Sequence, residues 1–296
     1  MLKYTFSGHE TFHCKSFWLK KGYDYITQGH SFVDENAVIE LGVGKNMVAS
    51  IRFWMKSFGL LNNENELTHF AHHIFDENEG LDKYLEDRTT LWLLHYMLAA
   101  TNYASIYSLV FGEYHRSRNE FDMQALEGFL KRKCFEEDFP FNSNTIQKDI
   151  RTLIRNYVQP VTSGSIDELY STLLLDLGLI LHFKNSESEK DTYSFNLRNT
   201  NLPPYQLIVF ILLSSFKDNT IDFRDLMYGK NPIGLILCLT ENVMDRLLRE
   251  ADENFNWLVY KEDAGNKQVQ IKERPNDNWS ILELYYQTVQ AKNNEI

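Results

Sequence analysis

The side chains best suited to chemistry stand near the start of this 296-residue chain, where two histidines and a glutamate lie among aromatic residues and lysines. His9, Glu10 and His13 spell H-E-x-x-H, the pattern in which two histidines one helical turn apart bind zinc and the glutamate acts as a base. The context disfavours this function, because Gly8 and its aromatic neighbours do not predict a helix and no third ligand follows at the spacing of the extended motif. A zinc hydrolase is therefore kept only as an alternative.

Basic side chains recur at helical spacing in two predicted helices, over residues 45–58 and 145–157. Separations of three, four and seven residues put side chains on one face of a helix. Such a face suits the major groove of DNA, where Lys and Arg neutralise phosphates and Asn or Arg reads base edges. The alternative is the solvated face of a surface helix. The candidate DNA-binding residues are Lys45, Asn46, Arg52, Lys56, Lys148, Arg151 and Arg155.

The elements that would carry these residues follow a repeated order. The first group consists of a helix over 35–41, a glycine turn, a helix over 45–58 stopped by Gly59, and a small hairpin over 60–67. This is the order of elements in a winged helix-turn-helix. Similar orders are expected from segments 121–134, 145–157, 180–183 and 193–197, and from segments 205–216, 221–228, 243–253, 257–261 and 267–272.

We therefore predict a mainly α protein with small β-hairpins (α+β), built of several winged helix-turn-helix-like units packed with extra helices. Residues 1–80 are expected to hold the N-terminal motif and the first such unit. Residues 81–200 are expected to form a helical middle region with the second unit, and residues 201–296 the C-terminal unit.

Composition bounds the function further. A net charge of −11 argues against a general nucleic-acid coat protein but permits a local basic face. The three cysteines are far apart in the sequence, which fits neither a zinc ribbon nor a disulfide framework and predicts a reducing cytoplasm. The longest apolar runs are shorter than the roughly 20 residues of a membrane span, so no membrane association is expected.

Four segments give the sequence a family resemblance: Phe6–Phe12, Trp18–Gly22, Leu41–Val48 and Ile51–Trp54. Over nearly its whole length the chain resembles the bacterial and archaeal family of domain of unknown function 4007. The recurring core of that family is G-H-E-T-F, a basic residue that corresponds to Lys15, and W-L, without a second histidine. Its members are similar to the SspB component of single-strand DNA phosphorothioation systems, which place sulfur in the DNA backbone and support antiphage defence.

This resemblance implies double-stranded DNA as a ligand, DNA nicking as the activity, and a cysteine desulfurase, an ATPase and an ATP-pyrophosphatase as partners. A nicking site needs a metal ion or a base beside the phosphate. We expect His9 to act as base or donor, Glu10 to hold Mg²⁺ or Mn²⁺, and Lys15 to neutralise phosphate charge, with no organic cofactor.

Two alternatives stay open. In the first, His9, Glu10 and Thr11 form a structural, hydrogen-bonded corner that ties the N-terminus to the first winged-helix unit. In the second, the protein is a non-catalytic winged-helix adaptor that binds DNA and docks sulfur-transfer partners through the acidic stretch 61–88.

Overall fold

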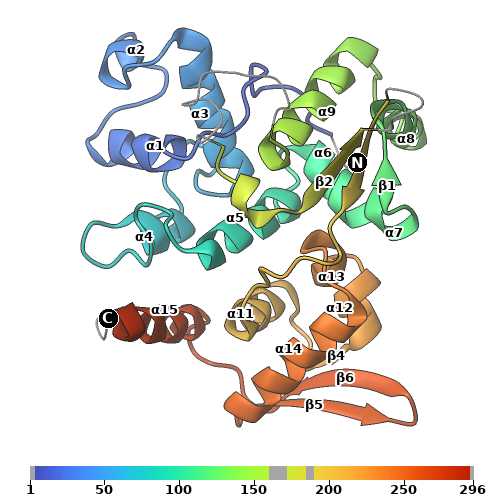
Figure 1. The fold of residues 1–296 in the computed structure, drawn as a ribbon. Coiled ribbons are helices and arrows are strands. Elements are labelled where there is room, and N and C mark those ends of the chain that lie inside the picture. Colours follow the sequence, from blue (N-terminus) through green and yellow to red (C-terminus); the bar gives the residue numbers. More distant parts are fainter. Residues whose placement is uncertain (1–3, 160–171, 185–189, 294–296) are drawn as a thin grey trace. The chain divides into compact units, whose positions relative to one another are not determined.

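The computed structural model describes residues 4–159, 172–184 and 190–293 of the chain. They belong to two compact units, Met1–Asn199 (unit 1) and Thr200–Ile296 (unit 2). Both units are mainly helical, and each contains one small antiparallel sheet (Figure 1).

Unit 1 begins with helices α1 (Trp18–Thr27), α2 (Ala37–Glu40), α3 (Lys45–Ser57), α4 (His69–Phe75) and α5 (Arg88–Ala100). A continuous helical stretch follows, made of α6 (Ser105–Tyr107), the π-helical run η1 (Ser108–Tyr114) and α7 (His115–Ser117). The later elements are β1 (Glu120–Phe121), α8 (Met123–Glu136), α9 (Ser143–Tyr157), the 3₁₀ turn η2 (Leu175–Leu177), β2 (Ile180–Lys184) and β3 (Asp191–Phe195). The three strands are antiparallel in the order β1-β3-β2.

Helix α9 shows how the sequence sets these elements. The side chain of Asn142 accepts a hydrogen bond from the main-chain N–H of Thr145 at 3.0 Å and so caps the helix. Ile146, Ile150 and Leu153 follow at intervals of four and three residues, and all are buried.

Helices α1 and α3 approach closely at Gly22. A Cβ at this position would lie 2.2 Å from Met55 Sδ and 3.1 Å from Ile51 Cγ2. Both of these side chains are fully buried, so they have little room to move. Helix α3 then ends as expected before Gly59, whose φ of +74° is in the region that glycine adopts at low cost.

Unit 2 contains α11 (Tyr205–Ser215), β4 (Thr220–Asp222), α12 (Phe223–Tyr228), α13 (Ile233–Ile236), α14 (Glu241–Asn254), β5 (Leu258–Asp263), β6 (Asn266–Ile271) and α15 (Trp279–Asn293). Its sheet is antiparallel in the order β4-β6-β5. Thr240 caps α14 as predicted, because its hydroxyl accepts the N–H of Val243 at 3.3 Å. The hairpin expected after α14 is present as β5 and β6.

The predicted class, mainly α with small β-hairpins, is confirmed. Three segments differ from the expected elements. The hairpin expected at 60–67 is a single bridge between Leu61 and Leu67. Phe121, the first residue of the helix expected over 121–134, belongs to β1 and pairs with β3. The first residues of the helix expected over 221–228 belong to β4 and pair with β6. Residues 185–189, at the tip of the expected second wing, lie outside the described residues. The winged-helix character and the three-part division of the chain stay predictions.

Within residues 4–159, 172–184 and 190–293, no helix combines the length and the hydropathy that a membrane span requires.

Candidate functional site

The N-terminal segment, residues 4–15, is held by side chains of α3 and α9. The indole N–H of Trp54 on α3 donates to the carbonyl oxygen of Phe12 at 3.1 Å. The main-chain N–H of Cys14 donates to the side-chain oxygen of Asn156 on α9 at 3.0 Å. Figure 1 shows this segment as the dark blue trace that runs from the N-terminus past α9 to α3. The segment therefore joins two helices that are distant in sequence.

His9 is the most enclosed polar residue of the segment, with an exposed fraction of 3%. Its Nε2 lies 2.8 Å from Oδ1 of Asp149, while its Nδ1 accepts the main-chain N–H of Thr11 at 3.0 Å. A ring whose Nδ1 accepts must carry its proton on Nε2, so Nε2 donates to the carboxylate. The hydroxyl of Ser50 on α3 donates to the carbonyl oxygen of His9 at 3.1 Å. Both ring nitrogens and the carbonyl oxygen are thus engaged.

Asp149 completes this buried arrangement from α9. It is 2% exposed, and both of its carboxylate oxygens lie 3.0 Å from the main-chain nitrogen of Ser7, which donates to them. A buried carboxylate is tolerated only when donors surround it. Sequence reasoning missed Asp149. The signal was a charged residue on the apolar face of α9, next to Ile146 and Ile150.

The backbone of this segment turns through unusual conformations. Ser7, Gly8, Glu10 and Thr11 have φ values of +70°, +99°, +49° and +66°. At Gly8 a Cβ would lie 2.6 Å from Cδ2 of Phe53, so only glycine fits against that ring. Positive φ at a β-branched residue such as Thr11 is strained, and strain of this kind clusters at functional sites.

Glu10 and Thr11 are both exposed at the outside of this turn. Within the described part of the chain, no hydrogen bond or ion pair joins the Glu10 side chain to another residue. Lys15 is half-buried, with its ammonium 5.9 Å from the centre of the Trp18 ring. The turn therefore presents one carboxylate to solvent next to a buried, hydrogen-bonded imidazole.

The H-E-x-x-H alternative does not fit this geometry. Residues 9–13 form a turn, so His9 and His13 are not related by one turn of a helix. His9 also directs Nε2 at Asp149. Among the described residues, no group of three or more His, Cys, Asp or Glu side chains is arranged to hold a metal ion. Glu10 alone fits the weaker requirement of Mg²⁺, which often binds through one or two carboxylates together with water and substrate phosphates.

Five of the candidate DNA-binding residues have exposed side chains: Lys45, Asn46, Lys148, Arg151 and Arg155. The last three lie on α9, on the face opposite Asp149 and Asn156. One face of α9 thus binds the N-terminal segment while the other presents three cations to solvent.

Arg52 and Lys56 of α3 are engaged within the protein. Arg52 Nε donates to Oδ1 of Asn65 at 2.8 Å, and Lys56 Nζ donates to the carbonyl oxygen of Asn63 at 2.9 Å. Partial burial and the neighbouring Arg52 charge lower the pKa of Lys56. Both side chains hold the turn that follows α3, whereas Lys148, Arg151 and Arg155 of α9 are exposed to solvent.

Comparison with known proteins gives one family and one fold. The family model described as "Protein of unknown function (DUF4007)" matches residues 6–286. Among solved structures, "Magnesium ion-bound SspB crystal structure" is similar with a TM-score of 0.83 and 23% identity, covering 97% of this chain and 89% of that chain. "SspB crystal structure" is similar with the same TM-score and coverage and 24% identity. Identities of this size show a shared fold. No curated protein matches.

Proposed function

Because this chain belongs to the DUF4007 family and has the fold of SspB, we propose that it is the DNA-binding component of a bacterial DNA phosphorothioation and antiphage system, and that it nicks DNA with Mg²⁺ or Mn²⁺. The observation that carries the proposal is the exposed Glu10 carboxylate. It lies on a strained turn that the hydrogen bond between His9 and Asp149 fixes in place.

The chemistry assigns each residue of the segment a role. Glu10 would provide one carboxylate ligand for a divalent cation, since Mg²⁺ is often bound through one or two carboxylates. Such a cation stabilises the charge that develops when a phosphodiester is cut. Lys15 would add a second positive charge from the same segment. His9 serves as the buried support of the turn, since its enclosed ring has no access to a substrate.

The three exposed cations of α9 supply the DNA contact. Lys148, Arg151 and Arg155 lie three and four residues apart on one outer face, and that face can neutralise successive phosphates. The proteins expected to act with this component are the cysteine desulfurase, ATPase and ATP-pyrophosphatase of the same system.

A non-catalytic adaptor is the second candidate function. It is favoured by the enclosure of His9, which leaves the turn without an evident base. In that case the α9 face binds DNA, and the acidic stretch 61–88 docks the sulfur-transfer proteins.

Conversion of supercoiled plasmid to open circle by the purified protein tests the nickase. Mg²⁺ or Mn²⁺ should support conversion and EDTA should stop it. Glu10→Ala should abolish it with an unchanged melting temperature, whereas the control Glu79→Ala, at another exposed acid, should cut like the wild type. Full activity of Glu10→Ala would remove the proposed site. Salt-sensitive plasmid binding without any cutting would favour the adaptor.

A further inference from the structure

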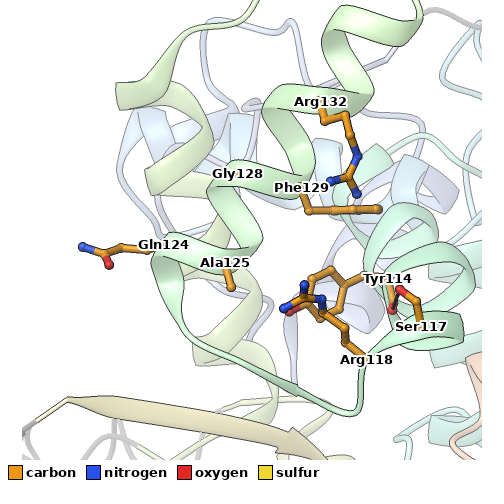
Figure 2. A pocket seen from close by; sticks show the side chains of 8 residues that line it. All are labelled: Tyr114, Ser117, Arg118, Gln124, Ala125, Gly128, Phe129 and Arg132. Atoms are coloured by element: carbon orange, nitrogen blue, oxygen red, sulfur yellow. Dashed lines mark hydrogen bonds between the residues drawn. The ribbon is translucent and has the colours of Figure 1, made fainter.

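A pocket of about 300 Å³ lies in unit 1 between α8 and the end of the helical stretch η1–α7. Figure 2 shows Ala125, Gly128, Phe129 and Arg132 of α8 on one side of it, and Tyr114 and Arg118 on the other. It shares no lining residue with the N-terminal turn or with the candidate DNA-binding residues. Its volume is at the lower end of the roughly 300–1,000 Å³ of ligand pockets, which suits a small ligand.

Two guanidinium groups give the pocket its charge. Arg132 lies over the ring of Phe129, with its Cζ 5.5 Å from the ring centre. Arg118 lies across the pocket beside Tyr114. The one carboxylate paired with Arg132 is Glu136, at 3.7 Å, and no ion pair among the described residues involves Arg118. The other nearby carboxylate is Asp122, whose side chain accepts the N–H of Ala125 and caps α8. The planar fork of the two arginines matches phosphate and favours an anionic ligand.

The remaining wall favours a ligand with a flat apolar part. A Cβ at Gly128 would meet no atom within 4 Å, so the α8 backbone itself borders open space. Ala125 is the neighbouring apolar group, while Phe129 is only 7% exposed and its ring lies under the Arg132 guanidinium, so the guanidinium plane is the stacking surface on this side. Arginine planes and aromatic rings are the surfaces on which nucleic-acid bases stack.

The helix opposite α8 is itself unusual. Ser108–Tyr114 is a seven-residue π-helical run, and it ends at Tyr114 in the wall of the pocket. π-Helical turns are rare and occur frequently at functional sites. This backbone places Tyr114 and, through α7, Arg118 at the pocket.

We propose that the pocket binds one phosphate-bearing nucleotide, with its phosphate beside Arg118 and Arg132 and its base over the open α8 backbone at Ala125 and Gly128. An open pocket of this size admits a free nucleotide or the end of a strand, because the bases inside a duplex are stacked and paired. The strand-end source rests on the proposed DNA function, whereas the free nucleotide does not.

Fluorescence anisotropy of the full chain with a labelled, 5′-phosphorylated single-stranded tetranucleotide tests this site. Gly128→Leu fills the pocket from an open position, and Arg118→Glu reverses one charge. Each should weaken binding by about tenfold or more, the effect of losing ~1.4 kcal/mol. The control Lys131→Glu changes a neighbouring cation of α8 that does not line the pocket, and its effect should be much smaller.

Competition identifies the source of the phosphate. Stronger displacement by unlabelled tetranucleotide than by dTMP or inorganic phosphate indicates a strand end, and the reverse order indicates a free nucleotide. The pocket assignment is overturned if the wild type does not bind the labelled tetranucleotide. It is also overturned if Gly128→Leu and Arg118→Glu bind the tetranucleotide like the wild type. Plasmid nicking and duplex binding by the same variants separate the two proposals. If the wild type cuts plasmid and neither pocket substitution changes tetranucleotide binding, the proposed function stands and the pocket assignment is rejected.

Discussion

His9 and Asp149 are 140 residues apart in the sequence, yet His9 Nε2 and Asp149 Oδ1 lie 2.8 Å apart in the interior of unit 1. The same carboxylate accepts the main-chain N–H of Ser7. The exposed position of Glu10 therefore depends on a helix far along the chain. An N-terminal turn with four positive φ values cannot hold its conformation alone, and Asp149 supplies the bonds that fix it.

Asp149→Ala should destabilise the protein by about 3 kcal/mol, because the buried donors of His9 and Ser7 would each lose their acceptor. Urea-induced unfolding followed by circular dichroism measures this change. Lys148 precedes Asp149 and is exposed on α9, so the free energy of unfolding of Lys148→Ala should stay within about 0.5 kcal/mol of the wild type.

A double-mutant cycle sharpens this test. Once Asp149 is absent, His9→Ala should cost much less than it does in the wild type, because the two residues share one interaction. Strict additivity of the two substitutions would contradict a direct stabilising contact between them.

Two glycines inside helices should respond in opposite ways to alanine. At Gly22 a new Cβ would lie 2.2 Å from the buried Met55 Sδ, so Gly22→Ala should destabilise the protein by roughly 1–3 kcal/mol. At Gly128 the new Cβ meets nothing within 4 Å, so Gly128→Ala should stabilise α8 by up to about 1 kcal/mol. Thermal melting of the two variants compares them. Equal shifts of the same sign would show that the α1–α3 contact is looser than described.

Acid should weaken unit 2 through Asp245. Burial opposes ionisation of this carboxyl, but hydrogen bonds from Arg249, Lys267 and Tyr260 outweigh it and lower its pKa from 3.8 to about 2. A depressed pKa means that its stabilisation is fully present above pH 3.8 and is lost as the pH falls through 2. The urea midpoint should therefore fall over this window, and Asp245→Asn should flatten the fall. If the urea midpoint of Asp245→Asn falls with pH as steeply as that of the wild type and of the exposed-site control Glu253→Gln, Asp245 is not the source of the acid sensitivity.

Helices α3, α9, α11 and α14 and the C-terminal hairpin could be predicted because their signals are local. Thr240 and Gly59 mark helix ends through their own chemistry, and α9 shows its buried face in the spacing of Ile146, Ile150 and Leu153. Strand β4 was not found because its pairing with β6 is a tertiary contact, which no local pattern encodes.

The candidate site was predictable only in part for the same reason. Phe6–Phe12 stood out by its residue types, and Glu10 is exposed there. The partner of His9 could not be found by spacing, since it lies on another helix 140 residues away. Arg52 and Lys56 show the opposite difficulty, because a basic helix face looks the same in sequence whether it binds phosphates or the protein's own turn.

That ambiguity gives a test of the DNA contact. Arg151 is exposed on α9, whereas Arg52 donates to Asn65 within the protein. Lys148→Glu combined with Arg151→Glu should weaken duplex binding strongly and reduce the slope of log K against log salt by about 2, the loss of two phosphate contacts. Arg52→Ala should lower the melting temperature and leave the salt slope nearly unchanged. Anisotropy titrations of a labelled 30-base-pair duplex over a range of salt concentrations measure both. If the slope changes with Arg52→Ala and not with the α9 variant, DNA binds along α3 and the assignment to α9 is wrong.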